Sequence, residues 1–467
     1  MKNKVFVLVS DGVSLRNFAY TSFYKLGIAQ GYDVVFWNAT PFNLEQLNLK
    51  EVKINNAKPG AFSDVLKTAL IRIELNLFSK RDKDDIYHKY KFPLSYKSIK
   101  ASVKSLIVQS YITRYSSEKG ILKIRQKIAS SERKTSYYKD CKTTLETEKP
   151  DFILSTSQRA LTAFAPLTAA QDLNIPTASF IYSWDNIPKA TTVVTTDFYF
   201  VWSTYMKNEL LHYQRYIASN QIRVTGTPQF ENHFDIALQE SKTDFFKSHN
   251  LDLNKKYICF SGDDITTSPK DEMYLRDLAK AVRSLNKKEH NLGVVFRKCP
   301  VDFSDRYDAV IKEYNDVIVP IEPKWKKMGA AWNSILPTKE DYKLQTNIIA
   351  HTECVVNLGS SMVFDYAAHN KPCAFIDYNY LNASNSYKKG VYVYDFVHFR
   401  SMPSSEAVIW LSNPNTMADQ LAAVLENPSK TISKARAWFE IINAHPPEHA
   451  CNRFWEEIEK LVIKNDA

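Results

Sequence analysis

The sequence lacks the cysteine patterns that mark zinc sites and disulfide frameworks. Its six cysteines lie far apart, and no two of them form a Cys-x-x-Cys pair. Zinc sites and disulfide-rich folds both depend on closely or regularly spaced cysteines, so we expect free, mostly buried thiols and no zinc. The six residues are Cys141, Cys259, Cys299, Cys354, Cys373 and Cys451.

Long hydrophobic runs are also missing. Residues 1–4 lead directly into the apolar run VFVLV, which is too short for the hydrophobic region of a signal peptide or for a bilayer-spanning helix. We therefore expect a cytoplasmic protein. The chain has 467 residues, of which 44% are hydrophobic and 24% charged, a globular composition that is too long for one core. Two or three domains are expected.

Charge is unevenly distributed along the chain. The formal net charge is +10, and residues 80–142 alone carry 17 Lys and Arg against 6 Asp and Glu, a net charge of +11. Tyrosines accompany these cations, as do Ile99, Val103 and Leu106 at helical spacing. The segment is interpreted either as solvated surface helices or as a surface for anionic lipid headgroups or a lipid-linked anionic acceptor. Nucleic acid is disfavoured, because no recognised nucleic-acid-binding motif accompanies the charge.

Strands and helices alternate along most of the chain, which predicts an α/β fold. The first half has a helix over 18–30 and strands over 4–9, 33–38, 151–156, 177–183, 198–203 and 222–226. After a polar stretch the pattern restarts, with strands over 257–262, 292–300, 316–320, 354–358 and 373–377. We therefore predict two Rossmann-like doubly wound domains, over 1–235 and 236–440, that face a ligand cleft. A basic helical insertion is expected over about 78–145, and a helix within 441–467 is expected to pack back toward the first domain.

The segment that begins at Cys354 changes character within a few residues. A short apolar strand gives way to Asn357, Gly359, Ser360 and Ser361, after which apolar residues return at helical spacing. Ligands gather where parallel strands end and helices begin, because free N–H groups and the helix dipole meet there. Glycine permits close backbone approach and the serines add hydroxyl donors. The turn is therefore suited to a phosphate or pyrophosphate.

Asp365 lies about one helical turn beyond these serines. Its carboxylate can accept hydrogen bonds from a ribose diol, or it can act only as a capping acid near the helix N-terminus. Ser261 and Gly262, which end the first strand of the same half, form a second turn suited to phosphate. The two acids that follow, Asp263 and Asp264, are interpreted as capping or solvated acids rather than as metal ligands.

The order of these features resembles the nucleotide-binding half of GT-B glycosyltransferases. Shared features are an aromatic residue before a Leu-Pro turn (Trp332), a helix, His351, the Gly-Ser-Ser turn, an acid six residues after the glycine, Lys-Pro and a final acid, Asp377. With the segments SWDN, VW and VTGTP, the resemblance covers roughly 183–380. It implies that the Gly-Ser turn holds the donor diphosphate and that Trp332 belongs to the donor site. It further implies that Asp365 binds ribose and Asp377 contacts the transferred sugar.

Arg297 is interpreted through the same resemblance. Many GT-B relatives have Arg-x-His-Pro at this place, so Arg297 is expected to meet donor phosphate, although Cys299 replaces the usual histidine. Enzymes of this fold stabilise the leaving diphosphate with helix dipoles and cations. We therefore expect neither a metal nor a cofactor, and the nucleotide-sugar is a substrate.

An acceptor site is expected in the first half. Sugar transfer with inversion needs a general base across the cleft from the donor. Asp11, in the loop after the first strand, is the first candidate, and Asp185, in SWDN, is the second. Arg16 is a candidate for binding an acidic sugar or an acceptor phosphate, and Trp184 for stacking on a sugar, with Asn186 beside it. The alternatives are structural: a turn-forming Asp, a paired Arg and a buried Trp.

Three functions compete at this point. The first is a nucleotide-sugar glycosyltransferase that builds a cell-surface glycan, on a glycan or lipid-linked acceptor, at the cytoplasmic face of a membrane. The second is a CDP-alditol phosphotransferase, because SSMVFDY is similar to a turn of the CDP-glycerol glycerophosphotransferases of teichoic acid synthesis. The lack of a histidine at position 299 counts against it. The third is a non-catalytic nucleotide-sugar binding protein.

Overall fold

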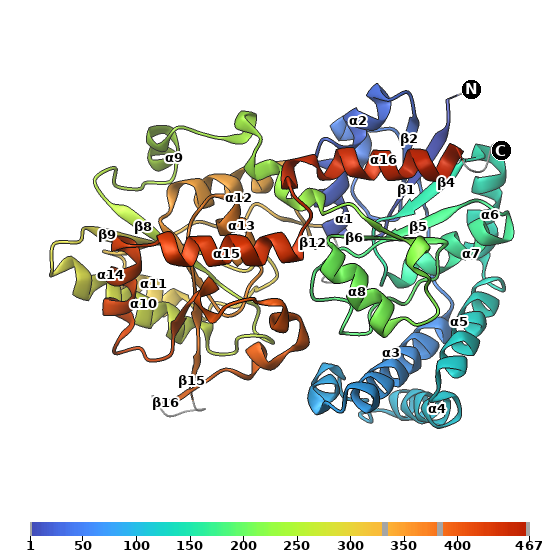
Figure 1. The fold of residues 1–467 in the computed structure, drawn as a ribbon, viewed down its shortest axis with the longest axis horizontal. Helices are drawn as coiled ribbons and strands as arrows, with labels where there is room; N and C mark the ends of the chain where they lie inside the picture. The colour runs from blue at the N-terminus through green and yellow to red at the C-terminus, as the bar shows by residue number, and fades with distance from the viewer. Residues whose placement is uncertain (1, 329–334, 381–385, 464–467) are drawn as a thin grey trace. The chain divides into compact units, whose positions relative to one another are not determined.

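The chain divides into two compact α/β units (Figure 1). The computed structural model describes every residue outside 1, 329–334, 381–385 and 464–467. Unit 1 comprises residues 1–229 together with 442–467, and unit 2 comprises residues 230–441. Both ends of the chain therefore belong to unit 1.

Unit 1 is built on a sheet that, within the described residues, has seven strands in the order β3-β2-β1-β4-β5-β6-β7. The strands are β1 (Lys4–Val9), β2 (Asp33–Asn38), β3 (Glu51–Lys53), β4 (Phe152–Ser155), β5 (Thr177–Phe180), β6 (Phe198–Val201) and β7 (Ile222–Val224). All neighbouring strands are parallel. Parallel sheets are covered on both faces, so their strands are continuous apolar runs, and Val5 to Val9 of β1 are fully buried.

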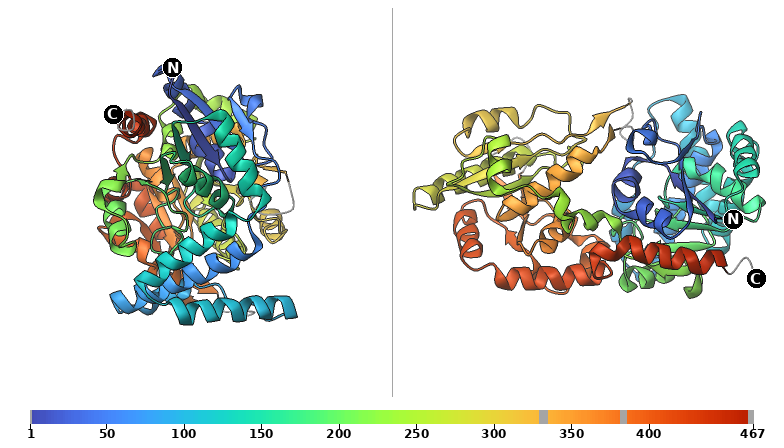
Figure 2. Two further views of the ribbon diagram at one scale, coloured as in Figure 1. Left: turned by 90° about the vertical axis from the view of Figure 1, so that its right-hand side faces the viewer. Right: turned by 90° about the horizontal axis from the view of Figure 1, so that it is seen from above.

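The helices of unit 1 cover this sheet and extend beyond it. They are α1 (Gly12–Ser14), α2 (Phe23–Ala29), α3 (Ala61–Asp82), α4 (Ile99–Tyr115), α5 (Glu118–Glu132), α6 (Ser136–Glu148), α7 (Phe164–Asp172), α8 (Thr204–Tyr213) and α16 (Ala450–Ile463). Helices α3 to α6 form one insertion between β3 and β4. Figures 1 and 2 show α4 at the edge of unit 1, away from the sheet, whereas Leu66 and Leu70 of α3 belong to the same core as Phe6 of β1.

The helix predicted over 18–30 is interrupted. A π-helical turn, Leu15–Ala19, comes first, and the regular helix α2 begins only at Phe23. The Tyr20 N–H reaches back five residues to the carbonyl of Leu15 at 3.2 Å, and the Thr21 hydroxyl donates to the carbonyl of Asn17 at 2.8 Å. The π-type bond spans five residues instead of four, so the α-helical hydrogen-bond pattern is broken here and restarts at Phe23.

Helix α16 completes the core of unit 1. Trp455 stacks on Phe23 with ring centroids 4.8 Å apart, and its indole N–H donates to the Phe23 carbonyl at 2.8 Å. Phe454 makes edge contacts with Phe18 and Phe180. A side-chain carbon at Gly27 would lie 2.2 Å from Trp455, so only glycine lets α2 approach α16 this closely.

Unit 2 has a sheet of six parallel strands within the described residues, in the order β10-β9-β8-β13-β14-β17. The strands are β8 (Lys256–Ser261), β9 (Leu292–Arg297), β10 (Ile318–Pro320), β13 (Cys354–Asn357), β14 (Cys373–Ile376) and β17 (Ile409–Leu411). Two short antiparallel pairs stand outside it, β11 (Lys326–Lys327) with β12 (Ile335–Leu336) and β15 (Tyr378–Tyr380) with β16 (Tyr387–Lys389). The helices are α9 (Lys242–Ser248), α10 (Asp271–Asn286), α11 (Asp308–Glu313), α12 (Lys339–His351), α13 (Met362–Ala368), α14 (Met417–Glu426) and α15 (Ser429–Ile442).

Among the described residues, no helix combines the length and the apolar character that crossing a bilayer requires. All six cysteines are free thiols, and five of them are buried.

Candidate functional site

The carboxyl edge of the unit 2 sheet gathers most of the predicted donor-site residues. Ser261 ends β8 and pairs in register with Arg297, which ends β9. Gly359 follows β13, and Asp377 follows β14. Because these strands are parallel neighbours, their ends lie side by side at one edge of the sheet. Trp332 lies outside the described residues.

The Gly-Ser-Ser turn has a conformation that needs glycine. Gly359 has a φ of +66°, and a side-chain carbon there would lie 3.1 Å from Phe399. The Ser360 N–H donates to Asn357 Oδ1 at 2.8 Å, which folds the turn against the end of β13. Ser361 occupies the N-cap of α13, and its hydroxyl caps no backbone group. The turn therefore presents the Ser361 hydroxyl at the sheet edge, whereas the N–H groups of Met362, Val363 and Phe364 already donate to oxygens of Ser360 and Ser361.

The second phosphate-side turn is also tightly packed. The Gly262 N–H donates to the Arg297 carbonyl at 2.9 Å. A side-chain carbon at Gly262 would lie 3.2 Å from the hydroxyl of Tyr307 and 3.4 Å from Asp271. Any larger residue would therefore have to displace the polar groups behind β8.

Arg297 is paired inside the protein. Its Nη2 lies 2.8 Å from Asp341 Oδ2, and the two side chains are 7% and 4% exposed. Asp341 also accepts from the indole of Trp325 at 2.6 Å and from the Lys324 N–H at 2.7 Å. The charge of Arg297 is therefore neutralised by a carboxylate. The sequence had predicted that this residue binds donor phosphate. Its Nη1 is buried and makes no hydrogen bond within the described part of the chain.

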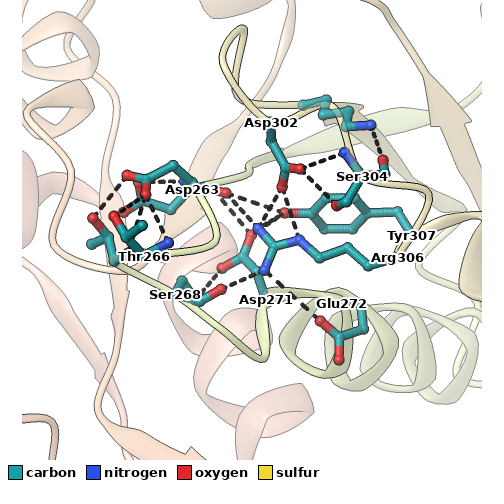
Figure 3. Close-up of polar contacts among 12 residues, drawn as sticks. Asp263, Thr266, Ser268, Asp271, Glu272, Asp302, Ser304, Arg306 and Tyr307 are labelled. Atoms are coloured by element: carbon teal, nitrogen blue, oxygen red, sulfur yellow. Dashed lines mark hydrogen bonds and ion pairs between the residues drawn. The ribbon is translucent and has the colours of Figure 1, made fainter. Parts of the chain in front are cut away.

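A buried polar network lies behind the first strand end (Figure 3). Asp271 accepts from the Tyr307 hydroxyl at 2.8 Å and from the Asp263 N–H at 3.1 Å. Arg306 donates to Asp302 at 2.8 Å and to the Asp263 carbonyl at 2.6 Å. Burial raises the pKa of Asp263 to about 7, with the charge of Asp271 adding to the effect, and raises the pKa of Asp271 to about 6. Asp263 is therefore not a solvated acid.

Asp264 behaves differently from its neighbour. Its carboxylate accepts from the N–H groups of Thr266 and Thr267 at 2.8 and 3.2 Å. Burial opposes ionisation of Asp264, but hydrogen bonds from the hydroxyls of Thr266 and Thr267, together with these N–H bonds, outweigh it and lower the pKa of Asp264. The capping interpretation fits this residue.

Asp377 lines a cavity of about 640 Å³ at the edge of unit 2. Its Oδ1 accepts from the Val391 N–H at 3.0 Å, and burial raises its pKa. Lys388, Lys389 and Trp410 line the same cavity. The mixture of carboxylate, ammonium and aromatic groups is one that sugar hydroxyls and ring faces can use.

The carboxylate of Asp365 is bonded to a residue that is distant in the sequence. Its Oδ1 lies 2.8 Å from His233 Nε2, and His233 Nδ1 lies 3.0 Å from His369 Nε2. His233 is contributed by the 3-10 turn Pro228–His233, 132 residues away in the chain. His233 could not be identified as a site residue from the sequence, because no local periodicity or motif relates it to α13.

Both candidate bases lie in unit 1, and both are already engaged. Asp11 caps α1 by accepting from the N–H and the hydroxyl of Ser14 at 3.0 and 2.9 Å. Asp185 accepts from Ser183 at 2.5 Å and from the Asn186 amide at 2.8 Å, and it pairs with Lys189.

The other acceptor candidates are held by neighbouring groups. Arg16 donates to Gln229 at 3.2 Å. Trp184 is 4% exposed, so packing rather than sugar stacking is its observed role. Asn186 is buried, and its amide oxygen accepts from Gln158 at 2.8 Å. Among the residues described, no cluster of three or more His, Cys, Asp or Glu side chains is placed to hold a metal ion.

Two doubly wound parallel-sheet units in one chain define the GT-B fold, and this chain has that fold, as the sequence predicted. A UDP-N-acetylglucosamine 2-epimerase is similar in structure with a TM-score of 0.54 and 11% identity, over 98% of this chain and 96% of that one. A glycosyltransferase from Rickettsia africae has a TM-score of 0.53 and 10% identity, over 99% of both chains. The wall teichoic acid polymerase TagF has a TM-score of 0.51 and 12% identity, over 100% of this chain and 89% of that one. No family model and no curated protein matches the sequence. At these identities the likeness establishes the fold alone.

Proposed function

We propose that the chain is a nucleotide-sugar-dependent glycosyltransferase that acts on a cell-surface glycan or lipid-linked acceptor. The observation that carries the proposal is the placement of the Gly359 turn and Asp365 together, where β13 of unit 2 gives way to α13. A serine hydroxyl at the end of a parallel strand suits a diphosphate, and a carboxylate one turn further suits a ribose diol.

The proposed division of labour follows from these positions. Ser360 and Ser361 bind the donor diphosphate, and Asp365 accepts from the ribose hydroxyls. Asp377 contacts the transferred sugar in the cavity beside it. Asp11 is proposed as the base that removes the acceptor proton, because a group that caps a single short turn can exchange that bond for one to substrate. Asp185 is the second candidate.

Helix α4 supports a membrane-bound acceptor. Large apolar side chains on and before it face solvent, and nearby lysines add positive charge. The exposed fractions are 89% for Phe92, 59% for Tyr96, 86% for Ile99, 50% for Val103 and 63% for Leu106. Apolar groups flanked by cations are what binding to an anionic bilayer requires. We propose that the enzyme is peripheral at the cytoplasmic face of the membrane.

A CDP-alditol phosphotransferase is the second candidate function. The similarity of the chain to TagF favours it, together with the turn SSMVFDY that begins at Ser360. An epimerase of nucleotide-sugars is a third, since an epimerase has the same fold. These activities share a nucleotide site and differ in what happens to the donor.

A thermal-shift screen against UDP, GDP, CDP, CMP and their sugars tests the shared part of the proposal. A specific ligand raises the midpoint by mass action, and Ser361→Ala should reduce that rise while the ligand-free midpoint stays the same. Donor consumption by the purified protein then separates the activities: transfer or hydrolysis releases the nucleotide, and epimerisation does not. The proposal fails if no nucleotide or nucleotide-sugar shifts the midpoint.

A further inference from the structure

A chain of two histidines holds Asp365 inside unit 2. The side chains of His233 and Asp365 are 1% and 9% exposed, with Nε2 and Oδ1 2.8 Å apart. Asp365 and His369 are four residues apart on and just after α13, so they lie on one face, and the imidazole of His233 contacts both. The rings of the two histidines are 4.9 Å apart and nearly perpendicular.

The protons in this chain follow from the acceptor at its end. A carboxylate only accepts hydrogen bonds, so His233 Nε2 carries a proton. Burial lowers the pKa of His369 to about 3, with the neighbouring His233 and Lys371 adding to the effect, so His369 is neutral. When His233 is also neutral, its Nδ1 accepts and His369 Nε2 donates. The second histidine thereby fixes the tautomer in which the first one faces Asp365.

The other oxygen of Asp365 is free to bind a ligand. Oδ2 makes no hydrogen bond within the residues that the structure describes, whereas Oδ1 is held by His233. A carboxylate fixed through one oxygen has lost its side-chain freedom before the ligand arrives, which lowers the entropic cost of binding.

We propose that His233 is a positioning residue of the nucleotide site. It holds the buried carboxylate of Asp365 through Oδ1 and fixes its orientation, so that Oδ2 accepts from the ribose of the nucleotide. The inference rests on the donor-binding role proposed above for Asp365. It assigns a ligand-binding consequence to a residue whose side chain is only 1% exposed.

The test compares three replacements by isothermal titration calorimetry with the nucleotide that gives the largest shift in the screen. His233→Phe keeps the ring volume and removes the hydrogen bond, so nucleotide affinity at pH 7 should fall about tenfold or more. His233→Gln keeps an N–H donor at the place of Nε2 and should bind within about threefold of the unaltered protein. His351→Phe is the matched control. His351 is half-buried, and this replacement removes its hydrogen bond with the Glu240 carbonyl at 2.9 Å. Nucleotide affinity should not change.

The Gln variant separates positioning from mere packing. Gln fills less volume than His or Phe, so a packing defect would lower affinity at least as much in His233→Gln as in His233→Phe. A positioning role instead requires the N–H donor, so only His233→Phe should then lose affinity.

Each outcome decides between the two proposals. Loss of affinity in Asp365→Asn with no loss in His233→Phe overturns the positioning role alone. Equal loss in His233→Gln and His233→Phe overturns it too, since a retained donor would then not matter. If Asp365→Asn binds as well as the unaltered protein, the donor site is misassigned. If the unaltered protein binds no nucleotide, the proposed function falls and this inference with it. Where His233→Phe fails to fold, His233→Met, which has nearly the shape of the Gln variant but no N–H donor, takes its place.

Discussion

Arg125 and Glu74 form an ion pair in the interior of unit 1, with Nη2 and Oε1 2.8 Å apart and side chains only 6% and 0% exposed. The same guanidinium donates to the carbonyls of Val193 and Thr192 at 2.9 and 2.6 Å. One cation of the basic segment, residues 80–142, therefore joins α5 to α3 and to the loop before β6. It is not available to any surface partner.

Removing one partner of this pair should destabilise unit 1 strongly. Arg125→Met leaves the Glu74 carboxylate buried without its cation and with the Gln214 amide as its remaining donor, which costs about 3–5 kcal/mol of unfolding free energy. Urea denaturation measures the loss. Lys123→Met, two residues away on the exposed side of α5, should change stability by less than about 0.5 kcal/mol. Similar losses in both variants would mean that the ion pair is not what stabilises the segment.

Gly359→Ala should damage the phosphate turn. The φ of +66° and the 3.1 Å approach to Phe399 both oppose a side chain, so a loss of about 1–3 kcal/mol is expected, together with weaker nucleotide binding. Gly31→Ala is the matched control, because Gly31 has a φ of +92° but nothing within 4 Å. It carries the backbone strain without the crowding and should leave nucleotide affinity unchanged.

The identity of the base is decided by separating turnover from binding. Asp11→Asn should lower kcat by orders of magnitude and leave donor affinity unchanged, because the residue is proposed to act only on the acceptor proton. If Asp185→Asn has this signature and Asp11→Asn does not, the base is Asp185. Loss of donor binding in either variant would indicate misfolding or a donor role instead.

Asp263 should make the protein less stable as pH rises, which is the opposite of the effect of an Asp whose pKa is lowered by folding. Burial raises the pKa of Asp263 to about 7, so its carboxyl binds a proton more tightly in the folded state than in the unfolded chain. The stability it contributes is complete below about pH 4 and is lost as pH rises through 7. Asp263→Asn should therefore stabilise the protein at pH 8, by at most about 4 kcal/mol, and have little effect at pH 4. Urea denaturation of both proteins at the two pH values measures the difference. A variant less stable than the unaltered protein at pH 8 would contradict the raised pKa.

The exposed stripe of α4 should carry membrane binding. Replacing Ile99, Val103 and Leu106 together by Ser should abolish sedimentation with anionic vesicles and spare transfer to a soluble acceptor analogue. Added salt should weaken binding of the unaltered protein, since Lys97 and Lys100 each contribute on the order of 1 kcal/mol near such a surface.

One control variant and two contradicting outcomes complete the vesicle experiment. Leu253 and Ile265 are 49% and 54% exposed on unit 2, and their replacement by Ser should leave sedimentation unchanged. Failure of the unaltered protein to sediment even at low salt excludes the membrane surface. Concentration-dependent dimers that the triple variant abolishes would assign the stripe to a second copy of the chain instead.

The fold was predictable because its signals are local. Continuous apolar runs bounded by turn residues located β8 and β13 to within about a residue, and the glycine and serines after β13 marked the turn. Which stripe of α4 faces inward was not predictable. Ser105, Val108 and Ile112 are buried while Leu106 is exposed, and only packing against α3 and α5 decides between the stripes.

The polar partners of the site residues could not be predicted from the sequence for a different reason. His233 with Asp365 and Arg297 with Asp341 are joined across 132 and 44 residues, and a single sequence holds no record of such pairs. The pKa of Asp263 likewise depends on burial and on Asp271 eight residues away, not on the turn that contains it. Residue types at strand ends predict a site, but their ionisation and pairing are properties of the folded chain.

Helix α16 has a consequence for the order in which the protein can be made. Its Phe454 and Trp455 seal the core of unit 1 against Phe18 and Phe23, and Gly27 leaves room for nothing else. A ribosome therefore has to finish the whole of unit 2 before unit 1 can close. Until then Phe18 and Phe23 lack the aromatic partners that they contact in the folded unit, and apolar surface exposed during synthesis promotes aggregation.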